Sequence, residues 1–248
     1  MSAATVNYIA SITDFFKSPN WMMNLLLGGV CVLIPLIGPI VVLGWLITGF
    51  WARQDERCET FPDFDFSNFG KYLERGLWPF LVSLAVSMAG TLVMIPIVWI
   101  LMIPMMLIGA TGDGDAGACI GLIFTVLIVI VCLVLALALL MVLVPLKIRA
   151  TITQDFVKSF DLGFVKRFLA LTWKEIILSS LFICVSSVVL TFVGMLVFCV
   201  GVYFASVLVY FAWTHLSKQL YQLYLSRGGA VIPLSPKLSD LPPGVPGV

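Results

Sequence analysis

The chain has 248 residues, of which 61% are hydrophobic and only 11% are charged, and its mean hydropathy is +1.11. These values exclude a soluble globular protein and predict an all-α, integral membrane protein. The ionisable residues comprise 14 basic side chains, 13 acidic side chains and one histidine. Because this balance lacks the basic excess that phosphate contacts require, we expect no nucleic acid among the partners.

Four long stretches carry no Asp, Glu, Lys or Arg, and together they make up more than half of the chain: residues 18–52, 76–112, 116–146 and 176–217. A helix needs about 20 apolar residues to cross the roughly 30 Å hydrocarbon core, because each residue adds about 1.5 Å. The stretches therefore predict four to six crossings. The last stretch is too long for one crossing, and Gly194 and Gly201 indicate a turn within residues 191–201.

The first charge-free stretch contains a predicted helix break at residues 34–39, which read Ile-Pro-Leu-Ile-Gly-Pro. Pro35 and Pro39 each remove a backbone donor and clash with the preceding turn, and Gly38 lies between them. Irregular backbone is not tolerated in lipid, so we expect the break to be packed inside the protein or to lie at an interface. Two interpretations remain open: residues 21–51 form a short hairpin, or they form one tilted, kinked helix.

The lysines and arginines predict the orientation of the chain. Four of them lie in residues 51–76 and six in residues 147–175. In the segment 111–118, by contrast, the only charged residues are acidic. The positive-inside rule places both basic loops and the C-terminus in the cytoplasm, with the acidic loop outside. The location of the N-terminus depends on whether residues 21–51 cross once or form a hairpin.

Three amphipathic segments each lead into a hydrophobic stretch, with apolar faces in residues 8–16, 69–73 and 164–171. A tryptophan marks each junction, as expected for a ring that prefers the membrane interface: Trp21, Trp78 and Trp173. The opposite faces of the second and third segments carry basic residues that we expect to face anionic headgroups of the inner leaflet: Lys71, Arg75, Lys166, Arg167 and Lys174. The alternative is that these segments are the wet ends of transmembrane helices.

A similarity between Phe64-Asp65-Phe66 and Phe160-Asp161-Leu162 is compatible with an internal repeat of one interfacial helix and two crossings. This repeat favours six membrane segments, with residues 21–51 as the shortest pair and both termini in the cytoplasm. We expect residues 1–227 to form a single helical membrane domain. Residues 228–248, which are rich in Pro and Gly, are expected to be an extended, disordered cytoplasmic tail.

No set of residues in the sequence predicts catalysis, cofactor binding or metal binding. No charged side chain falls inside a predicted span, which counts against a proton relay or an intramembrane hydrolase. His215 is the only histidine, and the six cysteines contain no C-x-x-C pair. We therefore expect no enzyme and no cofactor.

Small hydroxyl residues in the hydrophobic stretches offer one route to a transport function, because they could line a path for a neutral or lipid-like solute. Such residues are more typical of helix packing or of hydrogen bonds to backbone carbonyls. They are Ser83, Ser87, Thr91, Ser179, Ser180, Ser186 and Ser187.

Several short motifs stand out: Asp14-Phe-Phe-Lys-Ser-Pro-Asn-Trp21, Leu25-Leu-Leu-Gly-Gly29, Ile34-Pro-Leu-Ile-Gly-Pro39, Gly44-Trp45, Phe61-Pro-Asp-Phe64 and Gly76-Leu77. With these motifs the chain resembles the prokaryotic membrane family called domain of unknown function 4013, and the resemblance is most specific over residues 14–80. The chain departs from the family in having Phe61 before Pro62 instead of leucine, and Trp45 instead of tyrosine. The resemblance implies a multi-pass helical protein of the cytoplasmic (inner) membrane of a prokaryote, and it implies no activity.

Two functional hypotheses follow from the sequence. The first is a non-enzymatic structural, interaction or membrane-organising component, whose partners are the lipid bilayer and either a second copy of the chain or another membrane protein. The alternative is a transporter or channel for a lipid or small neutral solute, with the broken helix at residues 34–39 as its gate.

Overall fold

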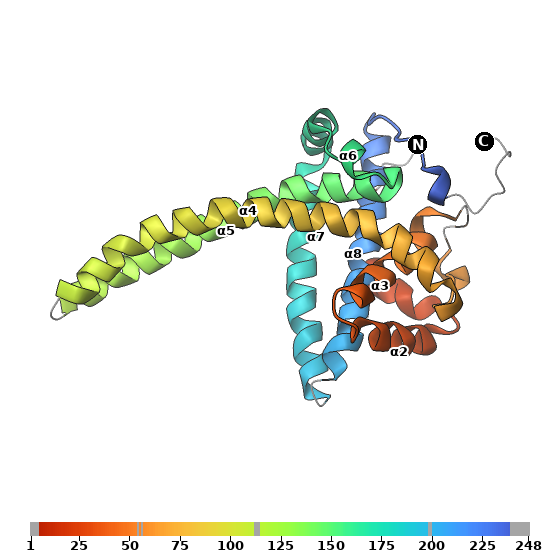
Figure 1. Cartoon of the computed structure of the whole chain (residues 1–248), viewed down its shortest axis with the longest axis horizontal. Coiled ribbons are helices and arrows are strands. Elements are labelled where there is room, and N and C mark those ends of the chain that lie inside the picture. The colour runs from red at the N-terminus through yellow and green to blue at the C-terminus, as the bar shows by residue number, and fades with distance from the viewer. Residues whose placement is uncertain (1–4, 54, 56, 112–114, 198–199, 239–248) are drawn as a thin grey trace. The chain divides into compact units, whose positions relative to one another are not determined.

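The computed structural model of the chain describes residues 5–53, 55, 57–111, 115–197 and 200–238, and these residues form helices and no strands (Figure 1). The all-α prediction is therefore confirmed for this part of the chain. The longer helices are α2 (Trp21–Val32), α3 (Ile37–Trp51), α4 (Phe69–Thr111), α5 (Asp115–Thr153), α7 (Leu162–Leu196) and α8 (Gly201–Ser226). The short ones are α1 (Ala10–Thr13), η1 (Asp14–Lys17), η2 (Cys58–Thr60), η3 (Phe66–Asn68), α6 (Phe156–Ser159) and η4 (Pro236–Leu238).

Three helical segments among the described residues are long and apolar enough to cross a membrane: Phe66–Leu107, Gly121–Thr153 and Leu162–Leu196. Helices α2 and α3 are also apolar, but their 12 and 15 residues rise only about 18 and 22 Å. Each is shorter than the roughly 30 Å hydrocarbon core. The structure therefore supports a helical protein with three candidate spans, and the predicted count of six remains a prediction.

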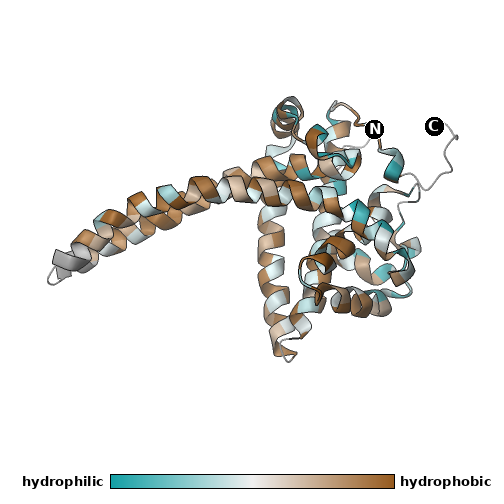
Figure 2. Ribbon diagram, in the orientation of Figure 1, coloured by the Kyte–Doolittle hydropathy of each residue, from teal (hydrophilic) through white to brown (hydrophobic). Residues whose placement is uncertain are grey.

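The chain divides into two compact units, of which the first contains residues 1–82 and 144–248 and the second contains residues 83–143. The second, which we call the hairpin unit, consists of the C-terminal part of α4 and the N-terminal part of α5. Figure 2 shows that both arms are hydrophobic. Large apolar side chains are exposed on them, such as Leu92 and Leu122, whose exposed fractions are 72% and 66%. So extensive an exposed apolar surface is typical of contact with lipid or with another membrane protein.

The predicted break in the first apolar stretch is confirmed, since α2 ends at Val32 and α3 begins at Ile37. The Ile37 N–H donates to the Pro35 carbonyl across 2.7 Å, and Leu36 has a positive φ of 64°, so the connection is a tight γ-turn. Pro39 lies in the first turn of α3, where a missing N–H costs little. Gly38 packs directly on the backbone of Cys31.

Helices α2 and α3 form a hairpin, and both helices are hydrogen-bonded to the same loop. Asn24 of α2 accepts the Phe64 N–H at 2.8 Å, and the Trp45 indole of α3 donates to the Pro62 carbonyl at 2.8 Å. The interpretation as one kinked helix is therefore wrong. The side chains at the tip, from Leu33 to Ile37, are exposed, so the break is not packed inside the protein.

Helix α3 is the buried centre of the first unit, and glycines let α4 cross it closely. Every residue from Ile40 to Phe50 is buried. A Cβ atom at Gly44 would lie 1.7 Å from the Tyr72 carbonyl oxygen, and one at Gly76 would lie 1.9 Å from the Ile40 carbonyl oxygen. The two backbones are thus in direct contact, and no larger residue fits at either glycine.

The amphipathic segments differ from the prediction of separate helices. The first consists of the short turns α1 and η1, and the other two are the first turns of α4 and α7. The alternative of helix ends is therefore correct for the second and third segments. Their apolar faces pack on protein: Tyr72 lies in one hydrophobic cluster, and Phe164 and Phe168 lie in another with Tyr224 of α8.

The predicted turn within residues 191–201 is confirmed, since α7 ends at Leu196 and α8 begins at Gly201. A Cβ atom at Gly201 would lie 2.5 Å from the Gly194 carbonyl oxygen, so these glycines allow α7 and α8 to meet closely. Helix α8 also contacts α1, α2 and α3. Of the predicted acidic loop at residues 111–118, Thr111 ends α4 and residues 115–118 belong to α5, while residues 112–114 lie outside the described residues.

The C-terminal segment, residues 229–238, is packed on the first unit, so the prediction of an unpacked tail is wrong for this part. Ile232 and Leu238 are buried. Backbone N–H groups of Ala230 and Ile232 donate to the hydroxyls of Tyr224 and Tyr221, at 3.0 and 2.9 Å. Hydroxyl groups of α8 thus accept hydrogen bonds from these backbone N–H groups, which no helix or sheet pairs. Residues 239–248 lie outside the described residues.

Replacement of Gly44 or Gly76 by alanine should destabilise the first unit, because the added methyl group must push α3 and α4 apart. We expect a loss of about 1–3 kcal/mol or more, measured as a lower thermal midpoint in detergent. Gly70→Ala is the matched control, because Gly70 lies in α4, as Gly76 does, and a Cβ atom added there would have no neighbour within 4 Å. A Gly44→Ala protein as stable as Gly70→Ala would contradict the crossing.

Replacement of Leu238 by alanine should also destabilise the protein, because its side chain is 0% exposed and packs against Leu43 and Ile47 of α3. A cavity of this kind typically costs about 2–5 kcal/mol. Leu234→Ala provides the control, since Leu234 belongs to the same segment but is 45% exposed. Equal thermal midpoints for the two variants would show that the segment does not pack on α3 in solution.

Candidate functional site

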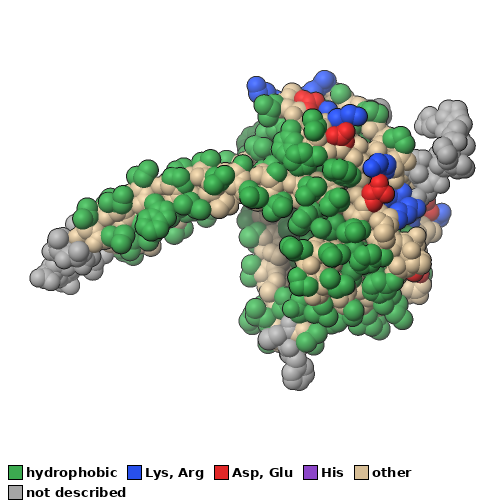
Figure 3. All heavy atoms as spheres, in the orientation of Figure 1, with side chains coloured by type: hydrophobic (Ala, Val, Ile, Leu, Met, Phe, Trp, Pro, Cys, Tyr) green, Lys and Arg blue, Asp and Glu red, His purple; other side chains and the backbone are tan. Residues whose placement is uncertain are grey.

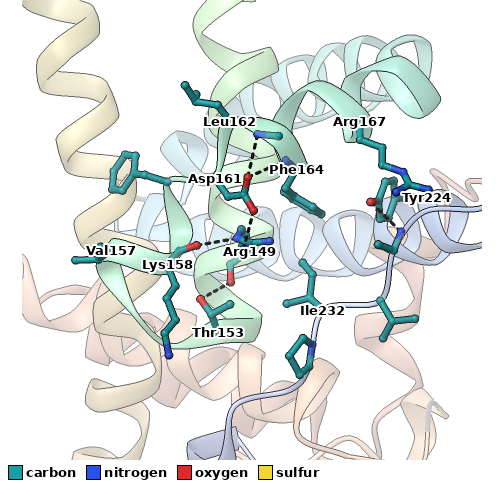
Figure 4. Close-up of a pocket in the computed structure, with 15 residues that line it drawn as sticks. Arg149, Thr153, Val157, Lys158, Asp161, Leu162, Phe164, Arg167, Tyr224 and Ile232 are labelled. Atoms are coloured by element: carbon teal, nitrogen blue, oxygen red, sulfur yellow. Dashed lines mark hydrogen bonds and ion pairs between the residues drawn. The ribbon is translucent and has the colours of Figure 1, made fainter.

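A cavity of about 960 Å³ lies in the first unit, where the end of α5, the start of α7, the end of α8 and the C-terminal segment come together (Figure 4). We call it the basic cavity, because its lining includes three cationic side chains and one carboxylate. These are Arg149, Lys158, Arg167 and Asp161. The apolar part of the lining includes Phe164, Tyr224 and Ile232, which belong to a buried hydrophobic cluster.

Asp161 organises this cavity through both of its carboxylate oxygens. Oδ1 accepts the N–H groups of Gly163 and Phe164 at 2.9 and 3.1 Å, which makes Asp161 the N-cap of α7, a position at which Asp is favoured. Oδ2 lies 2.9 Å from Nη2 of Arg149. A single side chain therefore starts the helix and orients the guanidinium group beside it.

Arg149 is held by further contacts. Its Nε donates to the Lys158 carbonyl at 2.7 Å, and its guanidinium group lies 5.3 Å from the centre of the Phe164 ring. Figure 4 shows Arg149 between Lys158 of α6 and Asp161, which precedes α7. Because it is fixed from three sides, this guanidinium group is preorganised.

Arg167 and Lys158 supply the remaining positive charge of the cavity. Arg167 is exposed, and its Nη2 donates to the Gly228 carbonyl at 2.9 Å. The Nζ atom of Lys158 lies 3.7 Å from Asp155 Oδ2. The Lys158 backbone N–H, which donates to Asp155, holds the pKa of that carboxyl below its usual value.

Exposed apolar side chains surround these charges. Val157, Leu162 and Val231 all line the cavity and are 79%, 68% and 75% exposed. The cavity therefore combines cationic groups with apolar surface. Such a combination can bind an anionic group that carries an apolar chain.

The structure places the predicted basic residues in different surroundings. Lys71, Lys166, Arg167 and Lys174 are exposed, and that they face headgroups stays a prediction. Arg75 is only 2% exposed, so the prediction that it faces headgroups is wrong.

Arg75 instead links α3, α4 and the C-terminal segment. Its Nη1 donates to Thr48 Oγ1 at 3.0 Å, and its Nε and Nη2 donate to the Lys237 carbonyl at 3.2 and 3.1 Å. The position of Arg75 on α4 turns it towards α3, where these oxygens compensate for its burial.

Sequence reasoning found only one of the basic residues of the cavity, Arg167. It missed Arg149 and Lys158, which it counted only as positive charge of a cytoplasmic loop. The available signal was the concentration of six basic residues within residues 147–175. That signal does not show which of them converge, because convergence depends on how α5, α7 and α8 pack.

The predicted interface anchors and the hydroxyl residues show no shared site. Trp21 packs on Phe16 with ring centroids 5.1 Å apart, whereas Trp173 is 46% exposed and Trp78 is partly buried. Thr91 and Ser187 donate to carbonyls of their own helices, at 2.9 and 2.8 Å. These two hydroxyls serve the helical backbone, as expected for packing positions.

A second polar cluster contains residue types that occur in thiol hydrolases. The Sγ atom of Cys58 lies 3.7 Å from Asp14 Oδ2, and the only histidine, His215, stacks on Phe50 with ring centroids 5.0 Å apart. Burial, and then the Asp14 carboxylate, raises the pKa of the Cys58 thiol to about 11. A thiol of this pKa is protonated at neutral pH and is a poor nucleophile.

No group of three or more His, Cys, Asp and Glu side chains that could hold a metal ion occurs among the described residues. The long apolar helices and the exposed apolar hairpin unit place the chain in the class of helical membrane-associated proteins.

A family model described as "Protein of unknown function (DUF4013)" matches residues 27–199, so the chain belongs to this family, as its motifs indicate. No curated protein and no solved structure matches the chain. The comparisons therefore supply a family and no activity.

Cys58 should resist alkylation in the folded protein, because only a minute fraction of a thiol with a pKa of about 11 is ionised at pH 8. Peptide mapping after treatment with iodoacetamide at pH 8 checks this, and unfolding should restore ordinary reactivity. Asp14→Asn removes the neighbouring carboxylate and should increase the reaction rate. Rapid modification of Cys58 in the native protein would contradict its protonated, buried state.

Proposed function

We propose that this protein is a non-enzymatic component of the prokaryotic cytoplasmic membrane that organises its surroundings by binding lipid and membrane-protein partners. The observation that carries this proposal is the exposure of apolar side chains along both arms of the hairpin unit. In the candidate spans Phe66–Leu107 and Gly121–Thr153, only 6% and 0% of the most hydrophobic window is buried within the chain. Such surface needs lipid or a partner to cover it.

The distribution of charge supports this role. Figure 3 shows hydrophobic side chains along the hairpin unit, and in the first unit the visible charged side chains gather away from the turn between α7 and α8. The chain carries no Asp, Glu, Lys or Arg between residues 116 and 146, where an ion path or proton relay would need one. Contact with lipid and protein is the function that such a surface supports best.

Gentle detergent extraction followed by native mass analysis tests the proposal. The protein should stay in membranes after an alkaline carbonate wash, and it should retain a second copy of the chain or bound lipid after extraction. Leu92→Ser combined with Ile100→Ser, at two exposed positions of α4, should weaken this retention, because apolar contact area is lost. Leu234→Ser, outside the hairpin unit, should not. A lipid-free monomer under every condition would contradict the proposal.

A further inference from the structure

We infer that the basic cavity binds a phosphate group, carried either by an anionic membrane lipid or by a soluble phosphate ester. Arg149 and Arg167 bind the phosphate, and Lys158 adds positive charge at the rim. The inference deepens the proposed membrane-organising function and rests on it, because it assigns a ligand to the polar end of the first unit.

The charge of the cavity favours an anion. Its lining contains three cationic side chains and the single carboxylate of Asp161. That carboxylate already accepts hydrogen bonds from two backbone N–H groups and forms an ion pair with Arg149, so both of its oxygens have partners. The charges of Asp161 and Arg149 largely compensate each other, and Asp155, whose Oδ2 lies 3.7 Å from Lys158 Nζ, offsets part of the Lys158 charge. The charge of Arg167 is therefore the main excess.

The hydrogen-bond donors of the cavity suit phosphate oxygens. A guanidinium group has five N–H donors in a planar fork that matches phosphate geometry. The Nε and Nη2 atoms of Arg149 contact Lys158 and Asp161, and this fixes the direction of the Nη1 amino group. Arg167 donates from Nη2 to Gly228, and its exposed guanidinium group offers further donors. Both guanidinium groups line the same cavity, so each can donate to a phosphate bound there.

The position of the cavity along the helices favours a lipid as the source of the phosphate. Arg149 lies three residues after the charge-free stretch 116–146, and Arg167 lies nine residues before the charge-free stretch 176–217. The cavity is therefore near the ends of two apolar segments, where headgroups are found. Its exposed apolar residues Val157, Leu162 and Val231 can contact an acyl chain, which a soluble ester lacks.

Arg167 and its neighbour Lys166 distinguish a built site from general attraction to a negative membrane surface. Both are exposed basic residues of α7, but only Arg167 lines the cavity. A diffuse surface potential acts almost equally on every basic residue near the membrane. A binding site depends on Arg167 and is indifferent to Lys166.

The experiment compares the full-length wild type with Arg167→Gln, Lys158→Gln and Lys166→Gln, each extracted in mild detergent. Each protein is titrated with phosphatidylglycerol and, separately, with inorganic phosphate. Lipid retention is measured by native mass analysis, and phosphate binding is measured by the shift of the thermal midpoint. The wild type and Lys166→Gln should retain phosphatidylglycerol equally. Arg167→Gln should retain it about tenfold more weakly, the loss expected for one charge-assisted hydrogen bond.

The outcomes separate the two sources of phosphate. Selective loss of phosphatidylglycerol retention in Arg167→Gln supports a lipid ligand, and a smaller loss in Lys158→Gln fits its place at the rim. Stabilisation by inorganic phosphate that Arg167→Gln abolishes, with equal lipid retention in all variants, supports a soluble phosphate ester. Equal behaviour of Arg167→Gln and Lys166→Gln in both titrations overturns the inference.

Membrane retention and oligomeric state, measured on the same samples, keep this inference apart from the proposed function. A protein that stays in the membrane and keeps its partner copy, but shows no dependence on Arg167, refutes the phosphate site alone. The thermal midpoint of each variant without ligand shows whether it is folded. Because Arg167 is exposed, we expect its replacement to leave that midpoint almost unchanged.

Discussion

The contact between the backbones of α3 and α4 at Gly44 and Gly76 is the constraint on which the first unit depends. It brings a carbonyl of each helix against the glycine of the other, so the two axes lie closer than side chains would allow. At this distance α4 covers one side of α3, and α8, which contacts α3 and carries Phe211 against Phe50, covers another. The result is a short helix that is buried from Ile40 to Phe50 and hydrophobic on all sides, as a core helix must be.

Polar contacts then close the structure around this core. Asn24 donates to Asp63 at 3.0 Å and accepts the Phe64 N–H, while Trp45 reaches the Pro62 carbonyl. These bonds join both arms of the α2–α3 hairpin to the loop that leads into α4. Because Asn24 and Trp45 are buried, each bond also satisfies a group whose desolvation would otherwise be costly.

The local features of this fold follow from the sequence, and the long-range ones do not. The helical class, the break at Pro35 to Pro39, the turn near Gly194 and Gly201 and the cap at Asp161 depend on neighbouring residues. The burial of Arg75 depends on Lys237, which lies 162 residues away, and no periodicity shows that pairing. An amphipathic helix end has the same pattern whether its apolar face meets lipid or protein, so the pattern could not predict that Phe168 packs on Tyr224. For the same reason, the sequence could not show that Arg149 and Arg167 line the same cavity.

Along α4 and α5, the side chains that the protein buries and the charged side chains of the first unit stop at similar positions. These helices, of 43 and 39 residues, would rise about 64 and 58 Å, which is twice the thickness of the hydrocarbon core. Their parts outside the hairpin unit contain the charged residues Arg75 and Lys147. Buried side chains also reach the limits of that unit, at Val82 and Val144. Each helical arm of the hairpin unit is then about 29 residues long and rises roughly 43 Å, close to the thickness of a bilayer with its headgroup regions. Between residues 83 and 143 the only charged residues are Asp113 and Asp115. A segment that is this apolar, little buried by its own chain and long enough to cross the bilayer is fitted to be covered by lipid or by a membrane partner, whereas the charged helix ends can remain in water.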